Sequence, residues 1–312
     1  MRNAFRDALI ELAEKDPKIV LLAADIGNRM FDGFKEKFPG RFYNCGVAEQ
    51  NMTGVAAGLA MTGFRPFTYT ITPFVTTRCL EQIRVDLCYH ELPVVVVAVG
   101  AGYAYASLGA THHACEDIAF MRSLPGMQVV CPGDSFEVKA ATAALGRCKG
   151  PSYLRLGKKN EPLVHQSVPS AFTIGRALVV QPGETVALLS TGNLLPEAME
   201  AAERLCGMGV SCEVVSFHTV KPLDTEYLTQ AFKKFRLVVT LEEHSRIGGL
   251  GGAVSEWVCS QREYPSARLI SLGTPDAFPH EAGHQPYFRE KFGLNGQKIS
   301  DSVQTILVSG TT

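Results

Sequence analysis

Glu49 opens the stretch of this sequence that is richest in chemical information, NCGVAEQNMTGVAAGLAMTG from Asn44 to Gly63. A carboxylate that enters an apolar site loses solvation of its charged form, so it can share a proton with a ring nitrogen. The alternative is a first-turn glutamate that only complements the helix dipole. The stretch predicts a buried helix because its apolar residues fall at helical spacing: Met52, Val55, Ala56, Leu59 and Ala60.

The segments around this helix alternate between helices and strands. In the first half, we expect helices at 2–15, 49–62, 115–123 and 134–146 and strands at 18–23, 93–99 and 127–131. The run PVVVVAVG is apolar on both faces, as a central strand of a parallel sheet must be. This rhythm is typical of a parallel sheet with helices on both faces.

A polar, proline-bearing stretch, GKKNEPLVHQSVP, separates this half from a second one and predicts a linker between domains. The predicted fold is therefore α/β with two domains, at 1–160 and 173–312, joined by a linker at 161–172. The second half predicts strands at 185–190, 212–217, 237–241 and 268–272 and helices at 196–206 and 249–260.

The composition favours small molecules or proteins as partners. The 312 residues carry 30 basic and 31 acidic side chains without a long run of either sign, which argues against nucleic acid or a membrane surface. Nine scattered cysteines without a Cys-x-x-Cys pair are typical of a reduced compartment. The N-terminal segment carries acidic residues, unlike a signal peptide, and no apolar run is long enough to span a membrane. The sequence therefore predicts a cytoplasmic protein.

Five segments resemble the transketolase family of thiamine diphosphate enzymes, in matching order and spacing. The likeness covers essentially the whole chain and is strongest to the C-terminal half, or β subunit, of a split transketolase. This half consists of a pyrimidine-binding domain followed by the transketolase C-terminal domain. The segments are GVAEQNMTGVAAG (46–58), FVTTRCLEQIR (74–84), GATHHACEDIAFMRSLPGM (109–127), GPSYLRLGKK (150–159) and LEEHSRIGGLGGAVSE (241–256).

The resemblance implies thiamine diphosphate and Mg²⁺ as cofactors. Family members hold the diphosphate through Mg²⁺ on a separate domain with a Gly-Asp-Gly motif, which this sequence lacks. We therefore expect no metal ligand from this chain. The resemblance implies a diphosphate-binding partner, the N-terminal half, in an α2β2 assembly with active sites at the interface.

The resemblance also implies which residues face the cofactor. Glu49 would hydrogen-bond the pyrimidine nitrogen and Phe74 would stack on the ring. Ile71 stands where the family has a first aromatic residue, so Tyr103 is an alternative stacking residue. Asp25 matches a family carboxylate near the cofactor. Taken alone, Phe74 is also compatible with a core position and Asp25 with a turn cap.

A second group of residues would face the substrate. His112 matches the family histidine that contacts the substrate carbonyl and hydroxyl, a role suited to a group that exchanges protons near neutral pH. Arg2 matches a phosphate-binding arginine, although an arginine near a terminus is usually solvated surface. His244 stands beside two carboxylates but lacks metal-ligand spacing, so we expect it to be structural.

Departures from the family pattern concern the substrate. Ser107 and Leu108 replace an acidic pair, and Gly100 replaces a histidine. Lys158 replaces a phosphate-binding arginine, and as a point charge it lacks the bidentate fork. Tyr103 and Tyr105 add aromatic surface. These changes predict cofactor chemistry of the family type on an unusual sugar or sugar phosphate.

The sequence thus favours a β-type subunit that transfers a two-carbon ketol or acyl unit from a ketose-type donor to an aldehyde. Two alternatives stay open at this point. One is a 2-oxoacid-decarboxylating relative, similar to deoxyxylulose-phosphate synthase or to a pyruvate dehydrogenase β subunit. The other is a non-catalytic regulatory subunit, against which the retention of Glu49, Phe74 and His112 argues.

Overall fold

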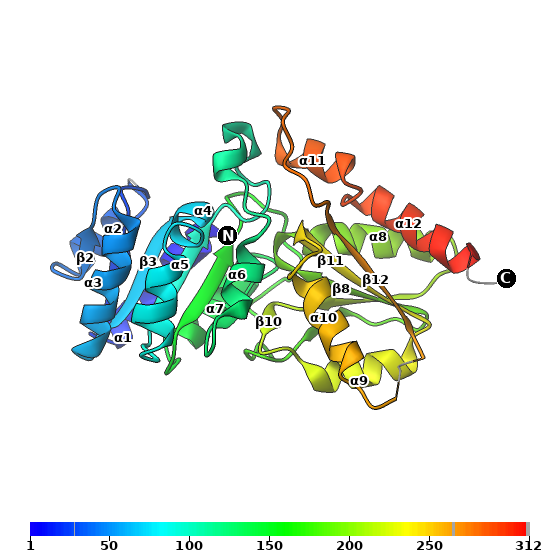
Figure 1. Ribbon diagram of the computed structural model, residues 1–312, viewed down its shortest axis with the longest axis horizontal. Helices are drawn as coiled ribbons and strands as arrows, with labels where there is room; N and C mark the ends of the chain where they lie inside the picture. Colours follow the sequence, from blue (N-terminus) through cyan, green and yellow to red (C-terminus); the bar gives the residue numbers. More distant parts are fainter. Residues whose placement is uncertain (28, 264–265, 310–312) are drawn as a thin grey trace.

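The chain forms two α/β domains, each built on its own sheet (Figure 1). The computed structural model describes residues 1–27, 29–263 and 266–309. The first domain holds a seven-stranded sheet and the second a five-stranded sheet, which lie side by side. The expected two-domain α/β fold is confirmed. Within the described residues, no helix is long and apolar enough to cross a membrane.

The seven-stranded sheet has the order β10-β5-β6-β4-β3-β1-β2. Every neighbouring pair is parallel except β10 with β5. The central strand β4 is buried along its whole length, as its continuous valine-rich run requires. The strands are β1 (Ile19–Ala23), β2 (Phe42–Asn44), β3 (Arg65–Ile71), β4 (Val95–Val99), β5 (Gln128–Val130), β6 (Ser152–Leu156) and β10 (Thr219–Lys221).

Helices cover both faces of this sheet because alternate side chains of each strand point to opposite faces. Val20 and Leu22 of β1 pack in the core beneath α3, η1 and α6, whereas Ile19 and Leu21 pack in the core beneath α1, α2 and α7. The helical segments are α1 (Arg2–Lys15), α2 (Asp32–Lys37), α3 (Glu49–Met61), α4 (Thr72–Val75), α5 (Leu80–Gln82), the π-helix η1 (Ile83–Cys88), η2 (Ala106–Leu108), η3 (Ala110–His112), α6 (Asp117–Ser123) and α7 (Ser135–Leu145).

The second sheet has the order β12-β11-β8-β9-β7 and is parallel except for the edge strand β7. Helices α8 and α12 cover one face, and α9 and α10 cover the other. The elements are β7 (Leu178–Gln181), β8 (Val186–Thr191), η4 (Gly192–Leu194), α8 (Leu195–Gly207), β9 (Cys212–Ser216), α9 (Thr225–Lys234), β11 (Leu237–Ser245), α10 (Leu250–Cys259), β12 (Arg268–Thr274), α11 (Gln285–Lys291) and α12 (Gly296–Ser309).

The second half of the chain also completes the first sheet. Strand β10 lies between β9 and α9 in the sequence, yet it pairs antiparallel with β5, placing Thr219 opposite Val130 (Figure 1). A division of the chain at 161–172 keeps the other strands with their own sheets, but it separates β10 from the first sheet to which it belongs. Its three residues carry no alternation long enough to be recognised, and the pairing is set by contacts distant in sequence.

A buried charge network also joins the two domains at β6, the other neighbour of β5 in the sheet. Arg155 of β6 donates to Asp117 at the start of α6 and to the carbonyl oxygens of Ala114 and Glu243. The Glu243 carboxylate, on β11, accepts hydrogen bonds from the Tyr103 backbone and from two side chains of α11. Strand β11 of the second domain is thereby tied to β6 and to the loop after β4.

Candidate active site

The expected site residues gather at one edge of the seven-stranded sheet. Parallel strands present their carboxyl ends at the same edge, which is where ligands bind in open α/β sheets. The strands β6, β4, β3, β1 and β2 are neighbours in that order. Lys158 follows β6, Tyr105 and His112 follow β4, Phe74 follows β3, Asp25 follows β1, and Glu49 follows β2.

Glu49 is the first residue of α3, and its side chain is 2% exposed. The Arg78 guanidinium donates to Glu49 Oε2 at 2.6 Å through Nη1. A buried carboxylate is stable only with a charged or hydrogen-bonding partner, and Arg78 supplies it. The environment of Glu49 is therefore polar on one side, where the sequence had indicated an apolar site.

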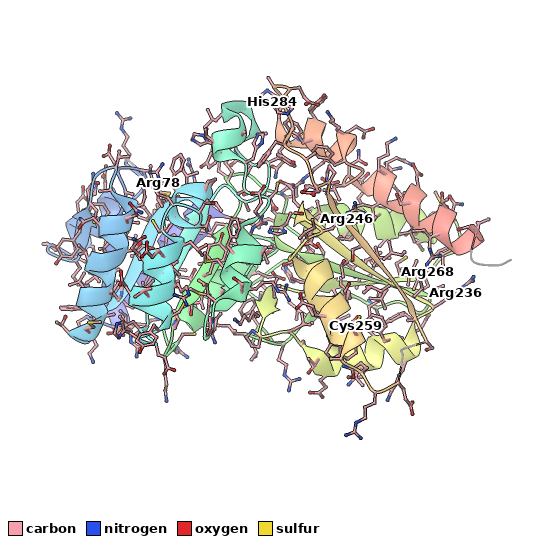
Figure 2. The ribbon with its side chains drawn as sticks, viewed as in Figure 1. Arg78, Arg236, Arg246, Cys259, Arg268 and His284 are labelled. Carbon is pink, nitrogen blue, oxygen red and sulfur yellow. The ribbon has the colours of Figure 1, made fainter. Side chains whose placement is uncertain are left out.

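Arg78 also lies over the Phe74 ring, with its guanidinium carbon 4.7 Å from the ring centroid. Figure 2 labels Arg78 at the end of the first domain that carries α4, and 43% of its side chain is exposed. One arginine thus contacts both the carboxylate and the aromatic ring expected to face a cofactor. Arg78 lies within the segment FVTTRCLEQIR, but the sequence alone indicated no role for it, because that role depends on a turn after α4 that returns it toward α3.

His112 also contacts Phe74, with the ring centroids 5.2 Å apart and an edge-to-face arrangement. Its Nδ1 is 2.9 Å from the Thr111 hydroxyl, which leaves Nε2 for a ligand. Burial, and then the nearby His113, lower the pKa of His112, so the ring is neutral at pH 7. A neutral imidazole can donate a proton to a developing oxyanion or accept one from a hydroxyl.

Two cations mark the far end of the site. The Lys158 ammonium lies 5.1 Å from the centre of the Tyr105 ring. The Arg2 backbone donates to the Lys158 carbonyl, which brings the start of α1 to the same edge. Arg2 Nε is buried without a hydrogen-bond partner, while the Arg2 side chain hydrogen-bonds to Tyr105. Lysine and arginine are the usual recognition groups for phosphate or sulfonate.

Asp25 follows β1 in a left-handed conformation, with φ of 49°. Its backbone amide donates to Asn44 Oδ1 and its carboxylate accepts from Asn44 Nδ2, both at 3.1 Å. The side chain is exposed, so it is available to a ligand or to a partner surface.

Three expected residues occupy other surroundings. Ile71 ends β3 and packs partly buried against the core under α1. Ser107 is exposed on η2. Tyr103 is 2% exposed and stacks on Phe288 of α11 at 4.7 Å, so the structure does not bring it together with Phe74. Of the two candidate stacking residues, Phe74 is the one that contacts His112 and also Arg78, which pairs with Glu49.

His244 is structural in this chain. The ring is fully buried, and its Nε2 accepts the backbone amides of Ile118 and Ala119 in the first turn of α6. Burial lowers the pKa of His244 to about 4, which keeps Nε2 free to accept. Within residues 1–27, 29–263 and 266–309, no group of histidine, cysteine or acidic side chains is arranged to hold a metal ion.

The site suits one end of thiamine diphosphate. A buried carboxylate, an aromatic ring and an imidazole in series fit an aminopyrimidine ring and a substrate beside it.

Two family models match the chain in succession. The model described as "Transketolase, pyrimidine binding domain" covers residues 1–162, and "Transketolase, C-terminal domain" covers residues 175–299. The fold and the site at its sheet edge thus define a chain of the pyrimidine-binding class. The chain belongs to the transketolase family, as the sequence predicted.

Several relatives are similar over nearly their full length. A "Putative transketolase C-terminal section" of Methanocaldococcus jannaschii is 38% identical over 97% of this chain and 95% of its own. A 6-deoxy-6-sulfo-D-fructose transketolase subunit of Clostridium sp. is 40% identical over 96% and 92%. One of the subunits of an apulose-4-phosphate transketolase of Phocaeicola vulgatus is 36% identical over 96% and 94%.

Solved structures agree with the fold. A structure described as "Split gene transketolase, inactive beta4 tetramer" superposes with a TM-score of 0.87 at 38% identity, covering 98% of this chain and 97% of that one. A Pichia stipitis transketolase gives 0.79 at 22% identity and matches over 45% of its length, which supports the fold alone.

Proposed function

We propose that this chain is the β-type subunit of a split, transketolase-like enzyme of the cytoplasm. The enzyme transfers a two-carbon ketol unit from a ketose-type donor to an aldehyde acceptor and uses thiamine diphosphate with Mg²⁺. The observation that carries the proposal is the series Glu49, Arg78, Phe74 and His112 at one sheet edge.

Each residue has a task in this scheme. Bound thiamine diphosphate supplies a stabilised carbanion for the group transfer. Glu49 holds and exchanges a proton at the pyrimidine nitrogen, and Phe74 binds the ring face. His112 moves a proton to or from the substrate oxygen through Nε2. Asp25 would contact the cofactor near the partner subunit, and Arg2 and Lys158 would bind the anionic end of the substrate.

The diphosphate and its Mg²⁺ would be held by a partner subunit in an α2β2 assembly. Two relatives are named as transketolase subunits, and the similar β4 tetramer is described as inactive. Both observations support a site that needs a second chain. The absence of a metal-binding cluster among the described residues of this chain is compatible with that division.

A non-standard sugar is the proposed substrate. The relatives named above act, by their names, on a sulfonated fructose and on apulose 4-phosphate. In this chain, the exposed Ser107 and Leu108 offer no charge to a donor hydroxyl. Full activity of the reconstituted enzyme with xylulose 5-phosphate and ribose 5-phosphate would contradict this part of the proposal.

Calorimetric titration of thiamine diphosphate with Mg²⁺ tests the division of the site. The titration is run on this chain alone and on its complex with the diphosphate-binding subunit. We expect binding only to the complex. Tight binding by the lone chain would refute the divided site, and absence of binding in both cases would favour a non-catalytic subunit.

A 2-oxoacid-decarboxylating activity is the second candidate. A deoxyxylulose-phosphate synthase of Geobacter sulfurreducens is 33% identical over 98% of this chain, which matches 48% of that protein. Turnover of pyruvate with an aldehyde, in the absence of any ketose donor, would favour this activity over ketol transfer.

A further inference from the structure

The Tyr105 ring occupies the space beside Gly100, directly after the central strand β4. A Cβ atom added to Gly100 would lie 2.2 Å from Tyr105 Cδ2 and 2.5 Å from Cε2. These separations are far below any van der Waals contact, so the ring can lie here only because residue 100 has no side chain. Gly100 and Tyr105 therefore act as one structural unit.

Tyr105 contacts groups from both ends of the site. Its ring is 6.5 Å from the His112 ring in an edge-to-face arrangement. The Lys158 ammonium lies over the same ring, and the charge and hydrogen bond of Arg2 oppose the rise in the Tyr105 pKa that burial causes. One aromatic ring thus adjoins the imidazole and the two cations.

We propose that Tyr105 is a specificity-determining residue, whose ring forms the wall between His112 and the cation pair Arg2 and Lys158. The wall sets the distance from the reacting carbonyl to the anionic terminus of the donor. The substrate class is a ketose whose last carbon carries a phosphate or a sulfonate. This inference rests on the proposed function.

The chemistry of the wall supports this class. A flat aromatic face packs against the C–H groups of a sugar chain and reads no hydroxyl group. Arg2 has a buried Nε without a hydrogen-bond partner, and the compact charge of Lys158 lies over the ring, so both cations adjoin the proposed wall. The donor would be recognised at its two ends and by its C–H face between them.

Tyr105→Ala and Tyr105→Phe test the wall in the reconstituted enzyme. The donors are xylulose 5-phosphate, fructose 6-phosphate, 6-deoxy-6-sulfofructose and hydroxypyruvate, which has no distal end. For the preferred anionic ketose, we expect Tyr105→Ala to lower kcat/KM at least tenfold, mainly through KM, and to change hydroxypyruvate turnover less than twofold. Tyr105→Phe keeps the ring and should stay within threefold of wild type. Which of these donors has the highest kcat/KM with wild type shows whether the enzyme prefers a terminal phosphate or a terminal sulfonate.

Calorimetry on the cofactor-free complex gives a readout other than activity. The Kd of the preferred donor should rise at least tenfold in Tyr105→Ala and little in Tyr105→Phe. Equal losses with all donors would mean a structural role and would overturn the inference. Turnover of hydroxypyruvate alone by wild type would also overturn it, whereas no turnover of any donor would refute the proposed function itself.

Gly100→Ala supplies an independent check through a double-mutant cycle. The added methyl must displace the ring, so Gly100→Ala should reproduce the donor preference of Tyr105→Ala. In the Tyr105→Ala background, it should add less than a threefold further change. Gly63→Ala is the control for backbone strain, since Gly63 has a similar φ of 92° and open space around a Cβ. Additive effects of Gly100→Ala and Tyr105→Ala on the donor preference would contradict the coupling between these two residues.

Discussion

At the scale of single residues, the site is organised by pairs of side chains. Glu49 has a cation at 2.6 Å, and that cation also lies on Phe74. Arg78 therefore fixes the carboxylate and the ring relative to each other before any ligand binds. Because rigid placement of reacting groups contributes to rate, we expect Arg78 to act as a positioning residue for Glu49.

Glu49→Gln should abolish proton exchange at the pyrimidine nitrogen while preserving shape. We expect kcat to fall at least about 100-fold in the reconstituted enzyme, in the range of general acid–base effects. Subunit assembly, followed by analytical ultracentrifugation, should be unchanged. The exposed Glu36→Gln is the matched control. Near-wild-type activity of Glu49→Gln would exclude the proposed role of this carboxylate.

Arg78→Ala should weaken cofactor binding because it removes the partner of a buried carboxylate and one face of the aromatic contact. We expect the Kd for thiamine diphosphate to rise about tenfold, in line with a charge-assisted hydrogen bond. Arg78→Lys should restore part of the affinity. Calorimetry on the complex measures both, with the exposed Arg84→Ala as control; an unchanged Kd in Arg78→Ala would contradict the positioning role.

The sequence predicted the site in part. Glu49, Phe74, His112 and Lys158 could be recognised by motif and do lie along one edge. The contacts of Arg78 and those between Gly100 and Tyr105 could not be predicted, because they form between loops that follow no spacing rule. Tyr103 is aromatic, as a stacking residue must be, but the structure buries it against Phe288 of α11, away from Phe74.

At the scale of elements, α6 is held by groups from both domains. Arg155 of β6 binds Asp117 at its first turn with distances of 2.7 and 3.1 Å, and His244 of β11 caps its amides. The loop that carries His112 ends at this helix. The placement of His112, the proposed proton-transfer residue, therefore depends on a charge network outside the site.

Arg155→Met tests this anchor. It leaves the Asp117 carboxylate buried without its cation, and breaking such a pair costs about 3–5 kcal/mol. We expect a loss of that size in the free energy of unfolding, measured with urea. The exposed Arg147→Met should stay within about 0.5 kcal/mol of wild type. A loss below about 1 kcal/mol would show that the network is not an anchor.

Elements with a clear period were predicted well. The helix expected at 2–15 is α1, and the expected helix at 49–62 is α3 apart from its last residue. Strand β3 was missed because it contains Pro66, and β6 because Arg155 interrupts its apolar pattern. For β6 the explanation is a tertiary contact, since Asp117 of α6 neutralises Arg155.

At the scale of the whole molecule, the domains are interlocked. Strand β10 comes from the second half and forms the edge of the first sheet, and the Arg155 network ties β11 to β6. The first sheet is incomplete without the second half of the chain. Unfolding should therefore be one cooperative transition.

The single tryptophan makes this cooperativity measurable. Trp257 lies in α10 against Phe232 and reports only the second domain, whereas far-UV circular dichroism reports both. We expect the two probes to give coincident urea midpoints. Separate midpoints, with Trp257 fluorescence changing first or last, would show that the domains unfold independently.

Stability should also depend on pH through His218, which joins β9 to β10. Its ring stacks on Phe172 at 3.9 Å, and burial, then His165, lowers its pKa to about 4. The unfolded chain binds this proton below about 6.5 and the folded chain only below about 4. The His218 contribution to stability is thus present above pH 6.5 and is lost as the pH falls toward 4.

His218→Phe keeps the stacking and removes the titration. The free energy of unfolding of wild type, relative to this variant, should be higher at pH 8 than at pH 5. Urea unfolding at the two pH values measures the difference, and the exposed His90→Gln serves as control. A difference that does not change with pH would contradict this origin of the pH dependence.

The interlocked strand also sets an order of events during synthesis. The ribosome releases β5 long before β10, so the first sheet emerges with an unpaired edge that another chain can join. This edge stays open until residues 219–221 leave the exit tunnel. A nascent chain is consequently most prone to aggregation in the interval between these two points, and a chaperone that covers the β5 edge would act there.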